Sequence, residues 1–162
     1  MYKIVVLFLF VFCSCSITNN LPTPKSTICP LDGDCTVTIL EHKSMVLNSN
    51  EDNSTSYTLQ EDSTHTVIRY EFKKNRNQEA TDGSYKEVII FEINNNTPQT
   101  LENEDLQKTK MLFRRFCFCR GQIGFYKVMN GKLEWNKKIN KLHFHLDFKI
   151  NEDSQIITTI DY

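Results

Sequence analysis

Glycine, proline and tryptophan are scarce in this sequence, whose 162 residues include five Gly, four Pro and one Trp. This scarcity, together with eleven Phe and six Tyr, excludes a low-complexity chain and favours an ordered domain. An excess of one charge is also missing, because 19 Lys and Arg face 20 Asp and Glu, for a net charge of −1. General nucleic-acid binders usually carry a strong basic excess, so we predict no nucleic-acid partner.

Familiar catalytic motifs are missing as well. The sequence contains no G-x-S-x-G, S-x-x-K or H-E-x-x-H pattern and no C-x-x-C pair. Residues 121–124 (Gly-Gln-Ile-Gly) lack the following Lys-Ser/Thr of a phosphate-binding loop. The sequence therefore predicts no cofactor and favours a binding protein over an enzyme.

Long apolar runs are limited to one, near the start of the chain. Met1-Tyr2-Lys3 precedes an uninterrupted apolar run over residues 4–12. About nine apolar residues are too few to span a membrane, but they fit the hydrophobic region of an export signal. We expect residues 1–14 to be a signal peptide.

The apolar run ends in residues 12–15 (Phe-Cys-Ser-Cys), which resemble the lipobox of bacterial lipoproteins. The resemblance implies that Cys15 is lipidated after cleavage, and that the membrane is a partner through this lipid anchor. Residues 15–28 would form a tether. No Asp follows Cys15, which by the same resemblance implies the outer membrane, facing the periplasm. A plain secretory signal cut near Ser16 is the alternative.

Alternation of apolar and polar residues dominates the rest of the chain. It is clearest at residues 68–72, 89–93 and 142–150, and each of these runs predicts a strand with one buried face. We also expect strands at residues 37–39 and 156–162. Residues 48–64 are mostly polar and predict a loop.

Two further segments carry local signals. Asn130-Gly131 predicts a tight hairpin between residues 125–129 and 132–135. Residues 101–112 place acidic side chains first and basic ones last, which predicts a short helix. Seven or eight strands with this one helix predict a mainly β protein, with residues 29–162 forming a single antiparallel β-sandwich or barrel-like domain.

Four cysteines follow the predicted tether: Cys29, Cys35, Cys117 and Cys119. In an oxidising compartment they predict two disulfides. Cys117 and Cys119 on one strand would have Cα atoms about 7 Å apart, near the limit for a disulfide. We therefore expect each to pair with Cys29 or Cys35, and the two crossed pairings stay open. A zinc site is the alternative, but zinc ligands usually have about two to four residues between them, which fits poorly here.

His143, His145 and Asp147 share one face of the strand predicted at residues 142–150. Two imidazoles and a carboxylate could bind a metal. A solvated sheet face accounts for the same row without a metal, and we prefer that interpretation.

Arg114, Arg115 and Arg120 form the one dense basic cluster of the sequence. Such a cluster could bind a phosphate, a lipid head group or an acidic glycan. Ion pairs with neighbouring carboxylates are the simpler interpretation.

Residues 29–35 (Cys-Pro-Leu-Asp-Gly-Asp-Cys) and 115–122 (Arg-Phe-Cys-Phe-Cys-Arg-Gly-Gln) together resemble a signature of small lipoproteins of flavobacteria and other Bacteroidetes. That group has no established activity, so the resemblance implies a lipoprotein and no catalytic residue. We predict a lipid-anchored, disulfide-stabilised envelope protein that acts as a binding or assembly module for an envelope protein or glycan. The alternatives are a small metal-dependent envelope enzyme using His143, His145 and Asp147, and a structural lipoprotein.

Overall fold

A computed structural model of the chain describes residues 29–49, 54–75, 85–117, 124–138, 141–150 and 155–162. Most of these residues form antiparallel strands, which confirms the prediction of a mainly β protein. The strands are β1 (Gly33–Ser49), β2 (Thr55–Lys74), β3 (Lys86–Asn94), β4 (Gln99–Glu102), β5 (Leu112–Phe116), β6 (Tyr126–Lys127), β7 (Asn130–Lys138), β8 (Lys141–Lys149) and β9 (Thr159–Asp161). A 3-10 helix, η1 (Asn103–Thr109), connects β4 to β5.

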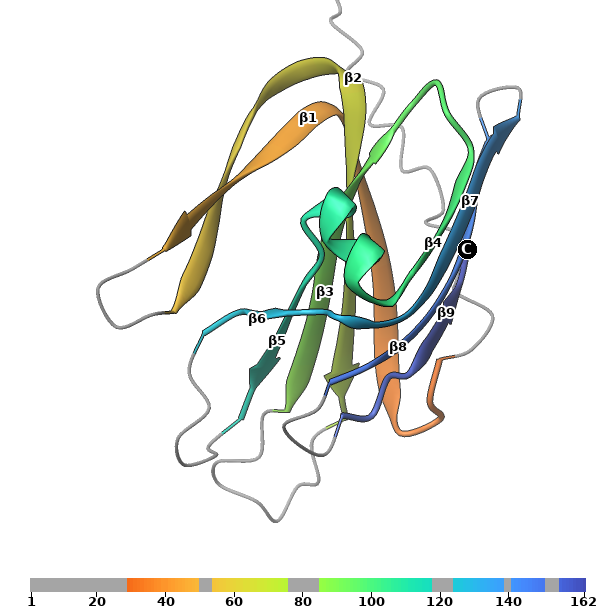
Figure 1. Cartoon of the computed structure of the whole chain (residues 1–162). Helices are drawn as coiled ribbons and strands as arrows, with labels where there is room; N and C mark the ends of the chain where they lie inside the picture. The colour runs from red at the N-terminus through yellow and green to blue at the C-terminus, as the bar shows by residue number, and fades with distance from the viewer. Residues whose placement is uncertain (1–28, 50–53, 76–84, 118–123, 139–140, 151–154) are drawn as a thin grey trace, which may run out of the picture.

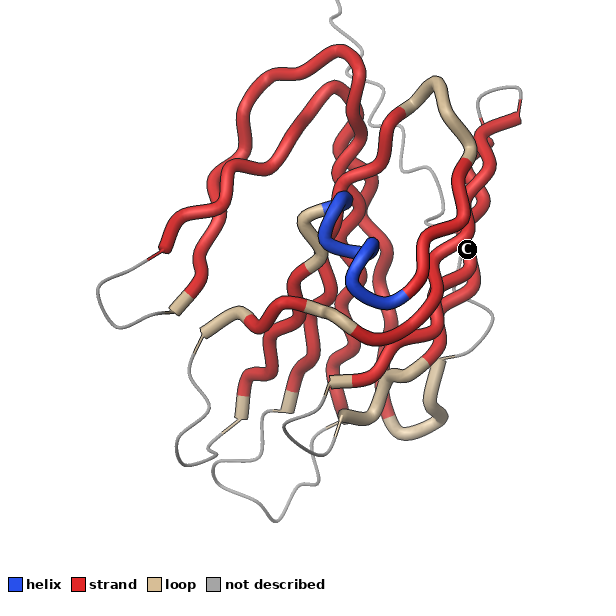
Figure 2. The backbone as a smooth tube through the Cα atoms, in the orientation of Figure 1, coloured by secondary structure: helices blue, strands red, loops and turns tan. Residues whose placement is uncertain are grey.

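The strands form two sheets that pack face to face (Figures 1 and 2). Sheet A has five strands in the order β1-β2-β3-β5-β6, and sheet B has four in the order β4-β7-β8-β9. The architecture is therefore a β-sandwich, not a closed barrel. Across the described ranges, no helix combines the length and apolar character that crossing a membrane requires.

The main core lies between the inner faces of the two sheets. Ile68, Tyr70 and Phe72 of β2 are each 0% exposed, as the alternation over residues 68–72 predicts. Phe91 of β3 meets Phe144 of β8 edge to face, with ring centroids 5.5 Å apart. Burying a large apolar side chain contributes about 1.5–3 kcal/mol, so this layer is the principal source of stability.

Much of the loop predicted over residues 48–64 is instead a continuation of the β1–β2 hairpin. The strand register runs on to the Ser49–Thr55 pair, after an irregularity between Glu41 and Lys43. We call residues 43–49 and 55–61 the hairpin arm, which bends away from the rest of β1 and β2 (Figure 1). The prediction was wrong because side chains on this arm are largely polar and show no sustained alternation.

The hairpin arm covers part of the outer face of sheet A. Met45 from the arm packs with Val67, Ile90 and Leu112, and all four side chains are 0% exposed. This second, smaller core explains why β3 is buried on both faces, although only residues 89, 91 and 93 were predicted to face the core.

The predicted helix at residues 101–112 is shorter than expected and of the 3-10 type. Its first turn is acidic and its last turn holds Lys108, in agreement with the predicted charge order. It is bounded by Asn103 and Lys110, whose φ angles of 52° and 53° are left-handed and interrupt regular helix geometry. Leu106 anchors it in the core with 0% exposure.

The hairpin predicted at Asn130-Gly131 is wrong. Both residues lie inside β7 and pair with Lys149 and Phe148 of β8. The preceding strand, β6, belongs to sheet A, so this dipeptide marks where the chain enters sheet B. Gly131 has φ 142°, and a Cβ there would lie 2.1 Å from the carbonyl oxygen of Asp147. The residue is thus a glycine because of close strand packing, not because of a turn.

Candidate functional site

The outer face of sheet B carries a row of polar side chains that crosses all four strands. Thr100 of β4 pairs with Glu134 of β7, which pairs with His145 of β8, which pairs with Asp161 of β9. Each of these residues has at least one buried neighbour along its strand, and both neighbours of Glu134 and of His145 are buried, so alternation places the row on the outer face. Four short segments far apart in sequence thus contribute to one surface.

A second row lies beside the first, and an open groove of about 650 Å³ runs between them. The second row contains Asn136 and His143, which pair directly across β7 and β8. Trp135 and Phe144 lie between the rows, and their side chains point into the core. The groove is lined by Pro98, Gln99, Thr100, Glu134, Trp135, Asn136, His143, Phe144, His145, Asp161 and Tyr162.

His145 links β8 to the edge strand β9. Its Nδ1 contacts the carboxylate of Asp161, and its Nε2 lies 3.0 Å from Oδ2 of Asp147. The hydrogen bond to Asp161, followed by that to Asp147, raises the pKa of His145 above its usual value. An imidazolium donates from both nitrogens, so the arrangement favours the charged ring.

The carboxylate of Asp147 is held by β9 as well. The hydroxyl of Thr159 donates to its Oδ1 at 2.7 Å. This hydrogen bond, and then that of His145, lowers the pKa of Asp147 below its usual value. Together these contacts fix the short C-terminal strand against β8.

The predicted metal ligands are only partly brought together. His143, His145 and Asp147 do lie on one face of β8, but His143 is exposed and makes no hydrogen bond to the other two within the described residues. Both nitrogens of His145 already contact carboxylates, so neither offers a free lone pair when the ring is charged. In the described part of the chain, no group of three or more His, Cys, Asp or Glu is arranged to hold a metal.

Asp161 is the member of this cluster that the sequence did not reveal. It lies in the strand predicted at residues 156–162, of which the structure retains only Thr159–Asp161. Its importance depends on which strand lies beside β9, and alternation alone carries no information about strand partners.

The arginine cluster is divided between the two faces of sheet A. Arg114 is on the outer face, with its guanidinium carbon 4.3 Å from the Phe116 ring centroid and 5.3 Å from that of Phe125. Arg115 points inward, is 9% exposed and pairs in register with Glu87 of β3. Arg120 lies outside the described residues. Arg114 and Arg115 therefore do not share one face of the sheet.

Glu87 next to Arg115 closes one end of the sandwich. This fully buried carboxylate accepts hydrogen bonds from the backbone amides of Ile156 and Ile157 at 2.7 and 2.8 Å. The hydroxyl of Tyr85 also donates to it, and burial followed by this contact raises the pKa of Tyr85. Glu87 thus pins the segment before β9 to sheet A.

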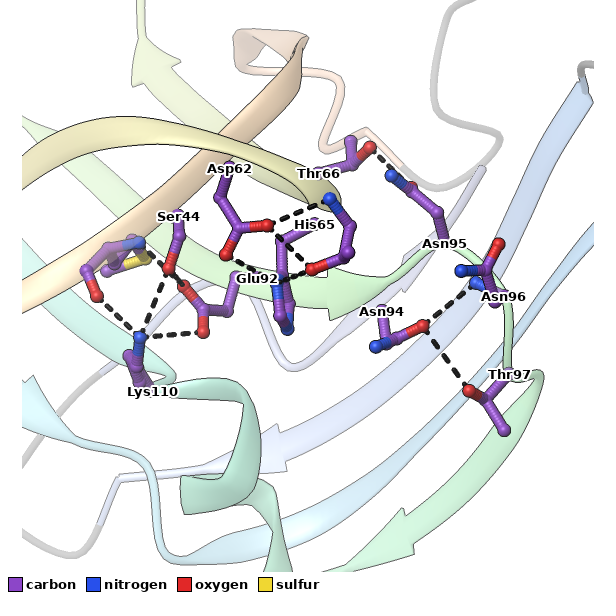
Figure 3. A network of polar contacts seen from close by, with 12 residues as sticks. Ser44, Asp62, His65, Thr66, Glu92, Asn94, Asn95, Asn96, Thr97 and Lys110 are labelled. Atoms are coloured by element: carbon purple, nitrogen blue, oxygen red, sulfur yellow. Dashed lines mark hydrogen bonds and ion pairs between the residues drawn. The ribbon is translucent and has the colours of Figure 1, made fainter.

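A second buried carboxylate, Glu92, fastens the hairpin arm (Figure 3). Its Oε1 lies 2.7 Å from Nζ of Lys110, and its Oε2 accepts from the Ser44 hydroxyl at 2.9 Å and the Met45 amide at 2.6 Å. Lys110 also donates to the Met45 carbonyl at 2.6 Å. Every group of this cluster is hydrogen-bonded within the protein, so it is a structural clamp and not an open site.

Figure 3 also shows a smaller contact at the bend of the hairpin. Asp62 accepts from the backbone amide and hydroxyl of Thr64 and contacts His65 at 2.9 Å. The two hydrogen bonds from Thr64 lower the pKa of Asp62 to about 2. The carboxylate therefore supports the irregular stretch of β2 between Glu61 and Thr66.

The expected crossed disulfides are wrong. Cys29 is bonded to Cys35, with Cα atoms 5.8 Å apart. A turn causes this pairing, because the amide of Gly33 donates to the carbonyl of Pro30 and returns the chain toward β1. Both sulfurs are thereby unavailable to zinc. Cys117 is also disulfide-bonded, and Cys119 lies outside the described residues.

Comparison with family models, with curated proteins and with solved structures gives no match for this chain. The candidate site therefore rests on the chain's own geometry. The outer face of sheet B is the strongest candidate, because it combines an open groove with polar side chains from all four strands.

Proposed function

We propose that the protein is an exported, lipid-anchored binding module that presents the outer face of sheet B to an envelope protein or glycan. The observation that carries this proposal is the groove between the two polar rows of that face. Concave sites with a few convergent polar groups are the usual form of a binding site.

Export and anchoring are supported by the sequence and by the cysteines. The apolar run at residues 4–12 and the lipobox ending at Cys15 favour passage across a membrane and lipidation. The Cys29–Cys35 disulfide fits the oxidising compartment that such a route leads to. Two or more acyl chains would anchor the protein durably, whereas a single chain gives marginal binding.

The polar side chains of the groove favour binding over catalysis. Glu134, Asn136 and His143 are exposed and offer a carboxylate, an amide and an imidazole to a polar ligand. The ring of His145 contacts only carboxylates, and within the described residues no Ser, Thr or Cys side chain is hydrogen-bonded to it. A nucleophile activated by this histidine is thus not present in the described geometry.

A capture experiment with matched variants tests the binding face. The bait proteins would be the wild type, Asn136→Ala/His143→Ala in the groove, and Lys108→Ala/Lys127→Ala at exposed positions on η1 and on β6 of sheet A. Each would be incubated with detergent-solubilised membranes of the source cells and with immobilised envelope glycans. We expect the same ligand to be enriched by the wild type and the control, and to be lost from the groove variant.

Equal enrichment by all three baits would contradict the assignment of this face. Enrichment of nothing, combined with stable self-association of the purified chain, would favour a structural lipoprotein instead.

A further inference from the structure

The part of sheet A's outer face that the hairpin arm leaves uncovered is basic. Lys73, Lys86 and Phe116 pair in one row across β2, β3 and β5, and Arg114 lies two residues before Phe116. Arg69 of β2 has the same orientation, because its neighbours Ile68 and Tyr70 are buried in the core. We call these five residues the basic patch.

Carboxylates neutralise the basic patch only partly. Glu71 contacts Arg69 and lies 3.6 Å from Nζ of Lys86. Lys73 and Arg114 have no carboxylate within ion-pair distance among the described residues. Four cations thus share this face with Glu71 and with Asp34 of β1, in a chain whose net charge is −1. The patch is therefore a local positive field on a nearly neutral protein.

An aromatic ring contacts two of these four cations. The Nζ of Lys86 and the guanidinium carbon of Arg114 are each 4.3 Å from the centroid of the Phe116 ring. Phe116 is only partly buried. Cations beside an aromatic side chain match the headgroup region of a membrane, where lipid phosphates attract the cations and rings lie at the interface.

The basic patch lies near the point at which the chain from the predicted anchor enters the fold. β1 begins with Gly33 and Asp34, which pair with Lys74 and Lys73. In Figure 1 the arrows of β2 and β5 end at the same end of sheet A at which β1 begins. The chain that follows the tether of residues 15–28 therefore enters the fold beside the basic patch.

We propose that the basic patch docks on anionic lipid headgroups of the membrane that holds the lipid anchor. This inference rests on the proposed function, because the anchor keeps the patch close to that membrane. Docking through sheet A leaves the outer face of sheet B, in the opposite layer, directed away from the lipid. The groove would then be presented to ligands in the adjoining space.

The test uses the full chain with Cys15→Ser, which carries no acyl group. Its partitioning is measured by sedimentation with vesicles of phosphatidylcholine alone and of phosphatidylcholine with phosphatidylglycerol. Residues 1–14, with Lys3 beside the apolar run, are the same in every variant, so the readout is the change of the anionic-to-neutral ratio from one variant to the next. We expect a preference for the anionic vesicles that disappears at high salt.

The paired variants locate the effect. Lys73→Gln/Arg114→Gln should lower the anionic-to-neutral ratio about thirtyfold, since each of the two cations near such a surface contributes about 1 kcal/mol. The matched control Lys108→Gln/Lys141→Gln removes the same charge from exposed positions outside the patch and should leave the ratio unchanged. If Arg114→Gln disturbs folding, Lys73→Glu alone provides the test, because Lys73 is exposed.

Equal binding to both vesicle types, or equal losses in the patch and control variants, would overturn the proposal. Such a result would leave the proposed lipid anchor untested, because the Cys15→Ser chain has no acyl group. Lipidation is measured separately, from the mass of the native protein.

Discussion

The outer faces of the two sheets of this sandwich differ in what lies over them. On sheet A the hairpin arm folds across the face, so that Met45, Ile90 and Leu112 are 0% exposed. On sheet B the equivalent surface stays open, and Asn136 and His143 border a groove of about 650 Å³. The covered part of the outer face of sheet A therefore contributes to stability, whereas the outer face of sheet B is open to a ligand.

The polar side chains of these two outer faces also differ in burial. The carboxylate of Glu92 on sheet A is buried, and all its contacts are internal. The side chain of His145 on sheet B is 39% exposed, and its hydrogen bonds reach Asp147 of the same strand and Asp161 of the neighbouring edge strand. Substitutions of residues buried under the hairpin arm on sheet A should therefore change the free energy of unfolding, whereas substitutions at the sheet B groove should chiefly change binding.

The largest expected effect is that of Glu92→Ala. Removing this carboxylate leaves the Met45 amide without its acceptor and Lys110 without its counter-ion. Loss of this half-exposed ion pair together with the two buried hydrogen bonds to Glu92 should cost about 3–4 kcal/mol, measured as the free energy of unfolding in urea. Glu134→Ala at the groove is the control and should leave the urea midpoint unchanged. Equal effects of the two substitutions would remove the distinction between the faces.

Met45→Ala tests the hairpin arm through packing instead of charge. Deleting a fully buried methionine side chain should lower the free energy of unfolding by about 2–4 kcal/mol. Val46→Ala, one residue further along the arm and 38% exposed, should cost less than about 1 kcal/mol. Urea unfolding of both variants gives the comparison, and similar costs would show that the arm does not cover the sheet in solution.

Loss of the disulfide at the entry to β1 should have a moderate effect. Cys29 and Cys35 are separated by six positions, so their bond closes a short loop. The loop-entropy relation gives about 2 kcal/mol for Cys29→Ser/Cys35→Ser. Thermal unfolding with and without reductant checks this value. Reductant should destabilise the wild type more than this variant, which lacks the bond, and an equal response would contradict the pairing.

The smallest effect concerns His145 and its pH dependence. Its pKa is raised in the folded protein, so its stabilising contribution is complete below the unfolded value of 6.5 and is lost as the pH rises through the folded value. The wild type should lose a few tenths of a kcal/mol relative to His145→Gln between about pH 5.5 and pH 8.5, because solvent screens this exposed group. Parallel stability profiles for the two proteins would show that the link to Asp161 is not formed.

Local alternation was sufficient to predict the inner faces of the sandwich. The runs at residues 68–72, 89–93 and 142–150 are strands with the expected buried faces, because one-sided burial leaves a period-two pattern in the sequence. The short helix could be predicted from its charge order, although the left-handed residues at its ends could not.

Contacts between distant segments were not predictable. Glu92 is the polar residue between two apolar residues of its strand, which predicts an exposed side chain. In the structure the hairpin arm covers it and places Ser44 within hydrogen-bond distance. His145 was identified on its strand face, but its partner Asp161 depends on β9 lying next to β8. The Asn130-Gly131 dipeptide shows the opposite error, since a strong turn signal occurs here inside a strand.

The most direct test of the anchored module is the intact mass of the native protein taken from the membrane fraction, measured before and after reduction. The account predicts an acylated chain that begins at Cys15 and gains the mass of about four protons when two disulfides are reduced. A chain without acyl groups and with free thiols would contradict it, because neither the anchor nor the oxidising compartment would then be present.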